Sequence, residues 1–285
     1  MAETSNVPQK QLTIEQASYE QLIASNSAKT LAGQLHLTET QIAKANTKLL
    51  QLLDDDKLEG CTKLSKLRFC YRVATLNYKQ DNAVAPVKYG NSVQAQLQDQ
   101  ALIEDMKECG GVEESNCVCL FKDIDYKPHV NKLGFTELDL PEEIKLDNPF
   151  QKLEIIGYYA YAKCVDGRTA TCVMSKQEVE EYALKKSISY KSFKKGNSKS
   201  AIWDDEFDKM ALKTVLKAVA RTVLKWFPYD RLSASLSLDQ PVFTETGEKY
   251  ADNPQSQSIG GSKVLKPDEE LVVDVTPQPT TPKEE

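Results

Sequence analysis

Residues 152–187 read KLEIIGYYAYAKCVDGRTATCVMSKQEVEEYALKKS, and this stretch decides the fold. Two runs rich in aromatic and β-branched residues flank Asp166-Gly167, a dipeptide typical of two-residue hairpin turns in which both central residues need positive φ. Ser175 and Glu178 then have the spacing of a capping box, in which the serine oxygen accepts from the third helical amide and the glutamate reaches back. The stretch therefore predicts a β-hairpin that leads directly into a helix over 176–187.

A long amphipathic helix follows in DKMALKTVLKAVARTVLKWFP at 208–228. Because each helical residue turns about 100°, side chains four positions apart drift by about 40° per step, and five basic residues fan over about 160° of one face. They are Lys209, Lys213, Lys217, Arg221 and Lys225. Apolar residues gather on the opposite side, which is expected to pack on the hairpin sheet. The acids at 204–208 load the first turn, and Pro228 ends the helix.

The rest of the chain divides into three parts. Residues 1–33 are polar and predict a flexible arm or a peripheral helix, whereas 34–228 form the core domain. Within this core we expect helices over 40–53, 63–78 and 92–111, a strand over 115–124, and short strands or irregular segments over 126–150. Residues 229–285 are rich in Pro, Ser, Thr and acid, so they predict a disordered acidic tail. The fold class expected is α+β, with a helical N-terminal part and a small antiparallel sheet whose hairpin packs on the long helix.

Charge is distributed unevenly along the chain. The formal net charge is −6, and residues 229–285 account for all of it, with five basic and eleven acidic side chains. Residues 1–228 balance at 31 basic and 31 acidic, yet 185–225 carry eleven basic and four acidic residues, a net of +7. This asymmetry indicates a polyanionic partner for the basic segment, with the acidic tail held apart.

The basic segment and the aromatic residues beside it favour a nucleic-acid interface, because single strands are held by cationic grooves with stacking platforms. On the long helix the middle cations are preferred, since Lys209 sits in the acidic first turn and Lys225 complements the helix C-terminus. A basic loop is expected over 190–202, and glutamine or asparagine can hydrogen-bond phosphates or base edges without adding charge. The candidates are Arg68, Arg72, Tyr89, Asn91, Gln94, Gln96, Gln98, Lys194, Lys195, Lys199, Trp203, Lys213, Lys217 and Arg221.

Each of these choices has a simpler structural alternative. The cationic helix face is also explained as an ordinary solvated surface, the glutamines as a polar helix face, and Trp203 as an anchor of the core. A membrane-surface helix would show a similar pattern. Here the apolar face ends in Trp226-Phe227-Pro228 and is better explained by core packing.

Enzyme signatures are missing from the sequence. No G-x-x-x-x-G-K-[ST], H-E-x-x-H or G-x-S-x-G motif occurs, so neither a catalytic nor a metal site is expected. The acids at 204–208 could still bind Mg²⁺ in a metal-dependent nuclease, and a scaffold that binds a partner through its tail is a second alternative. We expect no required cofactor, with Mg²⁺ only as a phosphate counterion. The seven cysteines are interpreted as reduced thiols. The sequence has no apolar run long enough to span a membrane and no secretory signal, so a cytoplasmic protein is expected.

Three segments resemble the RecT family of phage single-strand annealing recombinases, to which the Redβ proteins are related more distantly. They are VKYGNSVQAQLQDQALIEDMKECGG at 87–111, YYAYAKCVDGRTATCVMSKQEVEEY at 158–182, and W-x(3)-F-x(2)-M-A-x-K-T-V-L-K at 203–217, which is followed by KWFP. The resemblance covers roughly residues 40–230. The chain departs from the family pattern at 98–101, where Gly-Tyr-Lys-Gly is frequent, and at Lys217, where arginine is frequent.

The resemblance implies ATP-independent annealing of complementary strands by an oligomer, either a ring or a helical filament, in a bacterial host cell. Single-stranded DNA and the annealed duplex intermediate would be its partners. A partner exonuclease and the host single-strand-binding protein would contact the C-terminal tail. DNA binding should depend strongly on salt and little on sequence. Removal of the residues after about 230 should leave annealing measurable.

Overall fold

The computed structural model of the 285-residue chain describes residues 13–145, 148, 151–197 and 201–238. Its helices are the 3₁₀ turns η1 (Ile14–Gln16) and η2 (Asp56–Leu58), α1 (Tyr19–Ala24), α2 (Asn26–Gln34), α3 (Glu39–Leu53), α4 (Lys63–Leu76), α5 (Asp99–Glu108), α6 (Lys176–Lys186), α7 (Ile188–Lys194), α8 (Ile202–Asp205), α9 (Phe207–Trp226) and α10 (Asp230–Leu238). Its strands are β1 (Val84–Tyr89), β2 (Ser92–Leu97), β3 (Val112–Phe121), β4 (Lys127–Val130), β5 (Thr136–Asp139), β6 (Ile155–Cys164) and β7 (Thr169–Ser175). None of the helices so described is long and apolar enough to cross a membrane.

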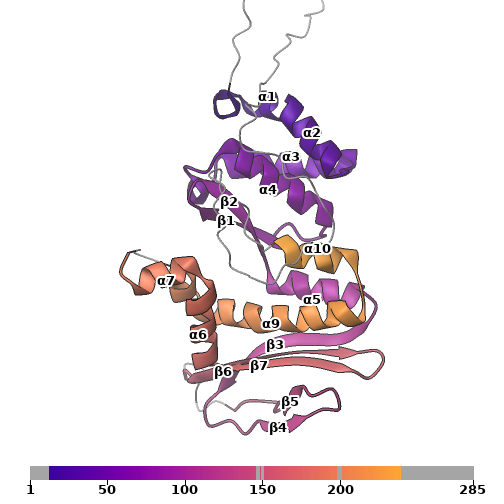
Figure 1. Cartoon of the computed structure of the whole chain (residues 1–285), viewed down its shortest axis with the longest axis vertical. Helices are drawn as coiled ribbons and strands as arrows, with labels where there is room; N and C mark the ends of the chain where they lie inside the picture. The colour runs from indigo at the N-terminus through magenta and orange to yellow at the C-terminus, as the bar shows by residue number, and fades with distance from the viewer. Residues whose placement is uncertain (1–12, 146–147, 149–150, 198–200, 239–285) are drawn as a thin grey trace, which may run out of the picture.

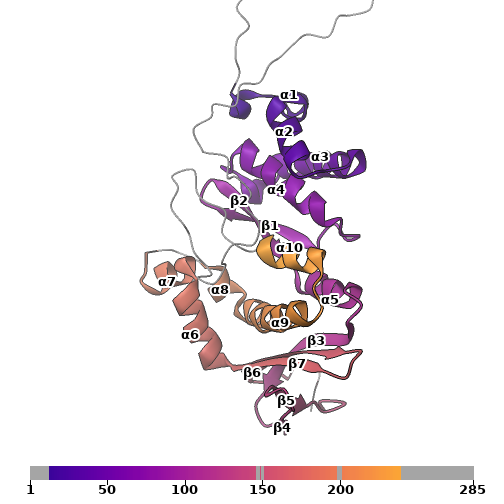
Figure 2. The same ribbon diagram turned by 45° about the vertical axis from the view of Figure 1, so that its right-hand side comes forward.

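The elements stack in layers along the long axis of the molecule (Figure 1). Helices α1–α4 form one end, the β1–β2 hairpin lies beneath α4, and α5, α9 and α10 form the next layer. The sheet of β3, β6 and β7 covers α9 from the other side, and the β4–β5 hairpin forms the far end (Figure 2). The predicted α+β class is confirmed.

The central sheet has the antiparallel order β3-β6-β7, with Tyr158 of β6 opposite Cys119 and Met174. Alternate residues of β6 face α9, since side chains on a strand alternate between the two faces. Tyr158, Ala160 and Ala162 on β6 and Val215, Val219 and Val223 on α9 are all buried in one hydrophobic core. The predicted packing of the hairpin on the long helix is therefore confirmed.

The β6–β7 turn differs in type from the predicted two-residue turn. The Cys164 amide donates to the Arg168 carbonyl (2.8 Å) and the Gly167 amide to the Cys164 carbonyl (2.9 Å), so three residues form the loop. Of these only Gly167 has a positive φ, at 80°. The Asp166 carboxylate instead stabilises the loop, since it accepts hydrogen bonds from the Arg168 amide (3.0 Å) and from Arg168 Nε (2.7 Å). A three-residue loop with glycine in the left-handed region is the next most common hairpin connection.

The capping box at the start of α6 forms as predicted. The Glu178 amide donates to Ser175 Oγ (3.2 Å), and the Ser175 amide donates back to Glu178 Oε2 (2.8 Å). These hydrogen bonds favour the charged carboxylate, so the pKa of Glu178 lies below its ordinary value. The cap fixes the direction in which α6 leaves the sheet.

The helix predicted over 92–111 is wrong in its first half. Ser92–Leu97 form β2, which pairs antiparallel with β1, and only Asp99–Glu108 are helical. Gly90, with φ of 59°, is the first residue of a two-residue turn closed by the pair Tyr89 and Ser92, as a type II′ hairpin requires. The Gly-Asn turn and the buried alternate residues Val93 and Leu97 are the strand signals that the glutamine-rich composition concealed.

Both predicted ends of the core domain require correction. Residues 13–34 are packed helices rather than a flexible arm, with Leu22 and Ala28 buried, so the peripheral-helix alternative holds for them. The C-terminal boundary at 228 is wrong, because α10 follows and buries Leu232 and Leu238. A truncation after about residue 230 therefore cuts into the packed core, and annealing is no longer expected to survive it. The rest of the predicted arm and tail, residues 1–12 and 239–285, lies outside the described residues.

The segment between α6 and α9 is more helical than predicted. The basic loop expected over 190–202 instead begins within α7, where Ser187 Oγ accepts from the Tyr190 amide (3.2 Å) as an N-cap. The acidic residues at 204–208 do not form one first turn. Asp204 and Asp205 belong to the short α8, and the backbone of Glu206 (φ −132°, ψ 46°) breaks the helix before α9 begins.

Candidate nucleic-acid interface

An open groove lies between the β1–β2 hairpin and α9, closed at one side by α6 and α8. Figure 2 labels the elements that form these walls, with α6 beside one end of α9. The lining residues that the argument uses are Tyr89, Gln94 and Gln96 on the hairpin, Lys186 on α6, Trp203 on α8, Lys213, Lys217 and Arg221 on α9, and Leu236 on α10. Seven of the candidates predicted in two separate clusters therefore meet in one groove.

One cation per helical turn lines the α9 wall of the groove. Lys213 is buried, Lys217 is half-buried and Arg221 is exposed. The gradient follows from the drift of about 40° per step, which carries successive cations from the packed interior toward solvent. The other two cations of the predicted face, Lys209 and Lys225, are exposed and lie outside the lining. The alternative of an ordinary solvated face therefore does not hold at Lys213, which is buried, and α5 and α10 pack against α9 in addition to the sheet.

The opposite wall is an edge of polar side chains on the β1–β2 hairpin. Gln94 and Gln96 alternate along β2 and both reach the groove. Gln96 Nε2 lies 3.3 Å from Met210 Sδ and so joins the hairpin to α9. Tyr89 stands at the end of β1 beside the turn, with 37% of its surface exposed. This wall offers uncharged hydrogen-bonding groups and one accessible aromatic ring, both suited to a nucleic-acid strand.

The groove has a strongly positive lining. Among the described residues it has four cationic side chains (Lys186, Lys213, Lys217 and Arg221) and no carboxylate. Lys186, in the last turn of α6, was not predicted. Its only sequence signal was its place in the basic segment. A concave site lined by one sign of charge concentrates the potential that attracts a polyanion.

A comparison with known protein families identifies the family of this chain. The family model described as "RecT family" matches residues 40–240, which include every residue of the groove lining. The chain belongs to the RecT family. The family range also includes α10, which confirms that the core does not end at Pro228.

One relative of this RecT-family chain is the uncharacterized protein YqaK of Bacillus subtilis (strain 168). It is 33% identical over 143 residues, which make up 49% of this chain. The chain matches 42% of the length of this relative. The likeness therefore concerns part of each protein.

Trp203 anchors the core of the RecT-family chain and offers no open stacking face. Only 6% of its surface is exposed, although its edge contributes to the groove lining. Its ring centroid lies 5.8 Å from that of Phe207 and 6.4 Å from that of Tyr190. The predicted stacking role is wrong, because a ring that is buried to this extent has no face open to a base. The core-anchor alternative holds, since aromatic rings from α7, α8 and α9 pack together there.

Other candidates lie outside the groove lining. Lys194 forms an ion pair with Glu180 (3.2 Å) and lies over the Tyr190 ring. Its pKa is raised by a hydrogen bond to Tyr190 and, to a smaller extent, by one to Glu180. Lys195, the residue after α7, is exposed, and Lys199 lies outside the described residues. Asn91 occupies the hairpin turn, and Gln98 occupies the N-cap position of α5 without a side-chain capping hydrogen bond.

Two lysines of α4, the helix that carries the candidates Arg68 and Arg72, make contacts within the fold. Lys63 Nζ donates to the Ala17 carbonyl (2.7 Å) and Lys66 Nζ to the Leu53 carbonyl (3.3 Å). Arg68 and Arg72 are half-buried and do not line the groove, and burial lowers the pKa of Arg72. Their role in DNA binding stays a prediction.

Two of the four acids at 204–208 are engaged in separate contacts. Glu206 pairs with Lys209 (2.9 Å), and Asp208 accepts a hydrogen bond from Tyr158 Oη (2.5 Å). Burial and then this carboxylate raise the pKa of Tyr158. Within the described part of the chain no group of three or more His, Cys, Asp or Glu side chains has the geometry to hold a metal ion.

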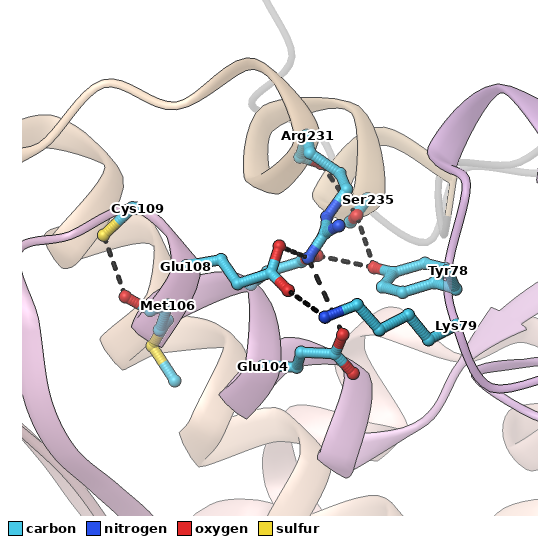
Figure 3. Close-up of polar contacts among 9 residues, drawn as sticks. Tyr78, Lys79, Glu104, Met106, Glu108, Cys109, Arg231 and Ser235 are labelled. Carbon is cyan, nitrogen blue, oxygen red and sulfur yellow. Dashed lines mark hydrogen bonds and ion pairs between the residues drawn. The ribbon is translucent and has the colours of Figure 1, made fainter.

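A second charged cluster, here called the Arg231 network, attaches α10 to α5 and to Tyr78 and Lys79, which follow α4 (Figure 3). Arg231 Nε donates to Asp105 Oδ1 (2.7 Å), while Nη2 makes ion-pair contacts with Glu108 (2.5 Å) and Glu104 (4.0 Å). Tyr78 Oη donates to Asp105 Oδ2 (2.5 Å) and lies 2.6 Å from Ser235 Oγ. The network fixes α10 at the end of the groove, where its Leu236 enters the lining.

Proposed function

We propose that this RecT-family chain binds single-stranded DNA in the groove and anneals complementary strands without ATP. The observation that carries the proposal is the meeting of Lys213, Lys217 and Arg221 on α9 with Tyr89, Gln94 and Gln96 on the hairpin. Family membership supports the same conclusion. The cations match a row of phosphates, and the amides can bind phosphate or base edges.

Annealing requires no covalent step from the protein. The groove would hold one strand by its backbone through the more accessible cations, Lys217 and Arg221, while the base edges stay open to the second strand. Watson–Crick pairing then tests the complement. Neither ATP nor a bound cofactor has a role in this sequence of events, and Mg²⁺ would act as a counterion of the phosphates.

The proposal includes oligomerisation on DNA, as a ring or a helical filament. A few phosphate contacts per subunit are weak at physiological salt, and linking many subunits along one strand turns them into strong combined binding. The partners proposed for residues 239–285 are an exonuclease that produces single strands and the host single-strand-binding protein. The site of action proposed is the cytoplasm of a bacterial host.

The test mixes the protein with a labelled strand, adds the complement without ATP, and follows duplex formation on a gel. We expect faster annealing than without protein, a loss of the acceleration at high salt, and no product with a non-complementary strand. An annealing rate equal to the protein-free rate would contradict the proposal. Parallel samples with Mg²⁺ test the nuclease alternative, for which shortened strands are the signature. Failure to retain the single strand at low salt would favour the scaffold alternative.

A further inference from the structure

The groove lining is chemically mixed. Beside its four cations it presents the apolar side chains of Val87, Ala95, Ile202, Met210 and Leu236. A ligand that fills such a site combines negative charges with small apolar groups at close spacing. DNA meets this description through its phosphates and bases, and a peptide that joins acids to branched aliphatic residues meets it equally well.

Helix α10 delivers the C-terminal part of the chain to this groove. The Arg231 network holds α10 in place, as Figure 3 shows, and Leu236 is part of the groove lining. Leu238, two residues later, is buried and is the last residue of the helix. The 47 residues from 239 to 285 therefore start beside the cationic site.

The sequence after α10 contains one segment with the matching composition. Residues 239–285 carry ten acidic and four basic side chains, a net of −6. In DEELVVDV at 268–275 the four acids adjoin Leu271 and three valines, with no basic residue among them. The other acids of 239–285 are scattered among polar residues or stand at the C-terminus, without neighbouring branched aliphatic runs.

We propose that residues 268–275 of this chain dock in the groove and compete with DNA for it. Twenty-nine residues, 239–267, separate the segment from α10. A chain spans at most about 3.3 Å per residue, so 29 residues are long enough to return to the groove. A short tether of this kind gives an effective concentration on the order of millimolar, so even a weak contact occupies the site. The inference rests on the groove being the DNA site. Residues 268–275 would then act as a brake, that is, an internal inhibitor of DNA binding, which a long strand displaces.

The test neutralises the segment in the full-length chain with Asp268→Asn, Glu269→Gln, Glu270→Gln and Asp274→Asn. The matched control makes the same change of charge elsewhere in the tail, with Glu245→Gln, Glu248→Gln, Asp252→Asn and Glu284→Gln. At low salt we expect the first variant to bind a labelled single strand about tenfold more tightly than the unchanged chain, and the control less than about twofold. The difference should shrink as salt rises, because both the brake and DNA binding are electrostatic.

A second measurement needs no DNA. Labelling of Lys217 and Lys186 by an amine-reactive reagent, followed by mass spectrometry, should increase in the 268–274 variant and stay unchanged in the control. Equal effects of the two variants would mean that net charge alone acts, and would overturn the inference. Unchanged affinity and labelling in both would also overturn it, while leaving the proposed function intact. Absence of DNA binding by all three proteins would contradict the proposed function, and the inference falls with it.

Discussion

The groove and the Arg231 network both include charged side chains and both involve α10, but their charges are arranged differently. The described groove lining contains four cations and no carboxylate. In the network Arg231, with 17% of its side chain exposed, meets three carboxylates, one of which, Asp105, is fully buried. A buried cation among carboxylates holds elements together, whereas cations gathered in an open groove attract a polyanion. The comparison separates the charges that serve the fold from those that serve binding.

The largest expected effect comes from ending the chain within α10. Truncation after Asp230 removes Arg231 and the buried Leu232 and Leu238, and leaves Asp105 buried without its cation. We expect a loss of at least about 5 kcal/mol, most of the stability of a typical domain. Truncation after Leu238 should leave the free energy of unfolding within about 1 kcal/mol of the full chain. Urea denaturation followed by circular dichroism measures both, and equal stability of the two truncations would break the comparison.

A substitution within the network should have the next largest effect. Arg231→Met leaves Asp105 uncompensated and should lower the free energy of unfolding by about 3–5 kcal/mol. Lys79→Met removes the other cation of the network, whose side chain is 84% exposed and lies 3.8 Å from Glu108, and should cost less than about 1 kcal/mol. Denaturant midpoints decide the outcome. Similar losses for both variants would show that burial does not separate them.

Removing groove cations should affect binding and leave stability nearly unchanged. Lys217→Ala with Arg221→Ala removes the two most accessible cations of the α9 wall. The slope of log affinity against log salt for single-stranded DNA should then become shallower by about 1.4, since each lost phosphate contact contributes about 0.7. Lys209→Ala with Lys225→Ala is the matched control, with the same loss of charge on the same helix outside the lining. Equal changes in slope would mean that the charge of α9, and not the groove, governs binding.

The smallest effect concerns the alkaline stability of the network. Burial, then the hydrogen bond to Asp105, raises the pKa of Tyr78 far above its ordinary value of 10. Above pH 10 the unfolded chain therefore releases a proton that the folded chain keeps, and stability falls as the pH rises. In Tyr78→Phe this contribution disappears, so the decline should be shallower by up to about 1.4 kcal/mol per pH unit. Urea unfolding at pH 9, 10 and 11 measures the dependence of the free energy of unfolding on pH. An identical dependence in both proteins would show that Tyr78 does not cause the decline.

Local signals explain the parts of the fold that the sequence predicted well. The two strands around Asp166-Gly167, the Ser175–Glu178 cap and the amphipathic period of α9 each depend on residues close in the chain. The β1–β2 hairpin was missed because its glutamines resemble a polar helix face, and α10 because its serines resemble a linker. In both cases the deciding force is burial against distant elements, which a local pattern does not contain.

The candidate site was predicted in pieces. The α9 cations and the hairpin amides were identified separately, and only the fold places Gln96 against Met210, 114 positions away. The burial of Lys213 could not be predicted, because it depends on contacts of α9 with elements distant in the sequence. Periodicity along a helix finds one packed face, whereas this helix is packed on several.

The sequence separation within the Arg231 network has a consequence for synthesis on the ribosome. Asp105 and Arg231 are 126 residues apart, and Tyr78 and Ser235 are 157 apart. At about 5–20 residues per second, the ribosome needs roughly 6–25 s after making Asp105 before it supplies the arginine. During that interval the buried carboxylate has no cation, so α5 can settle only when the chain is almost complete. The nascent protein should therefore stay sensitive to protease until α10 emerges, and a ribosome stalled before that point should hold an unfinished core.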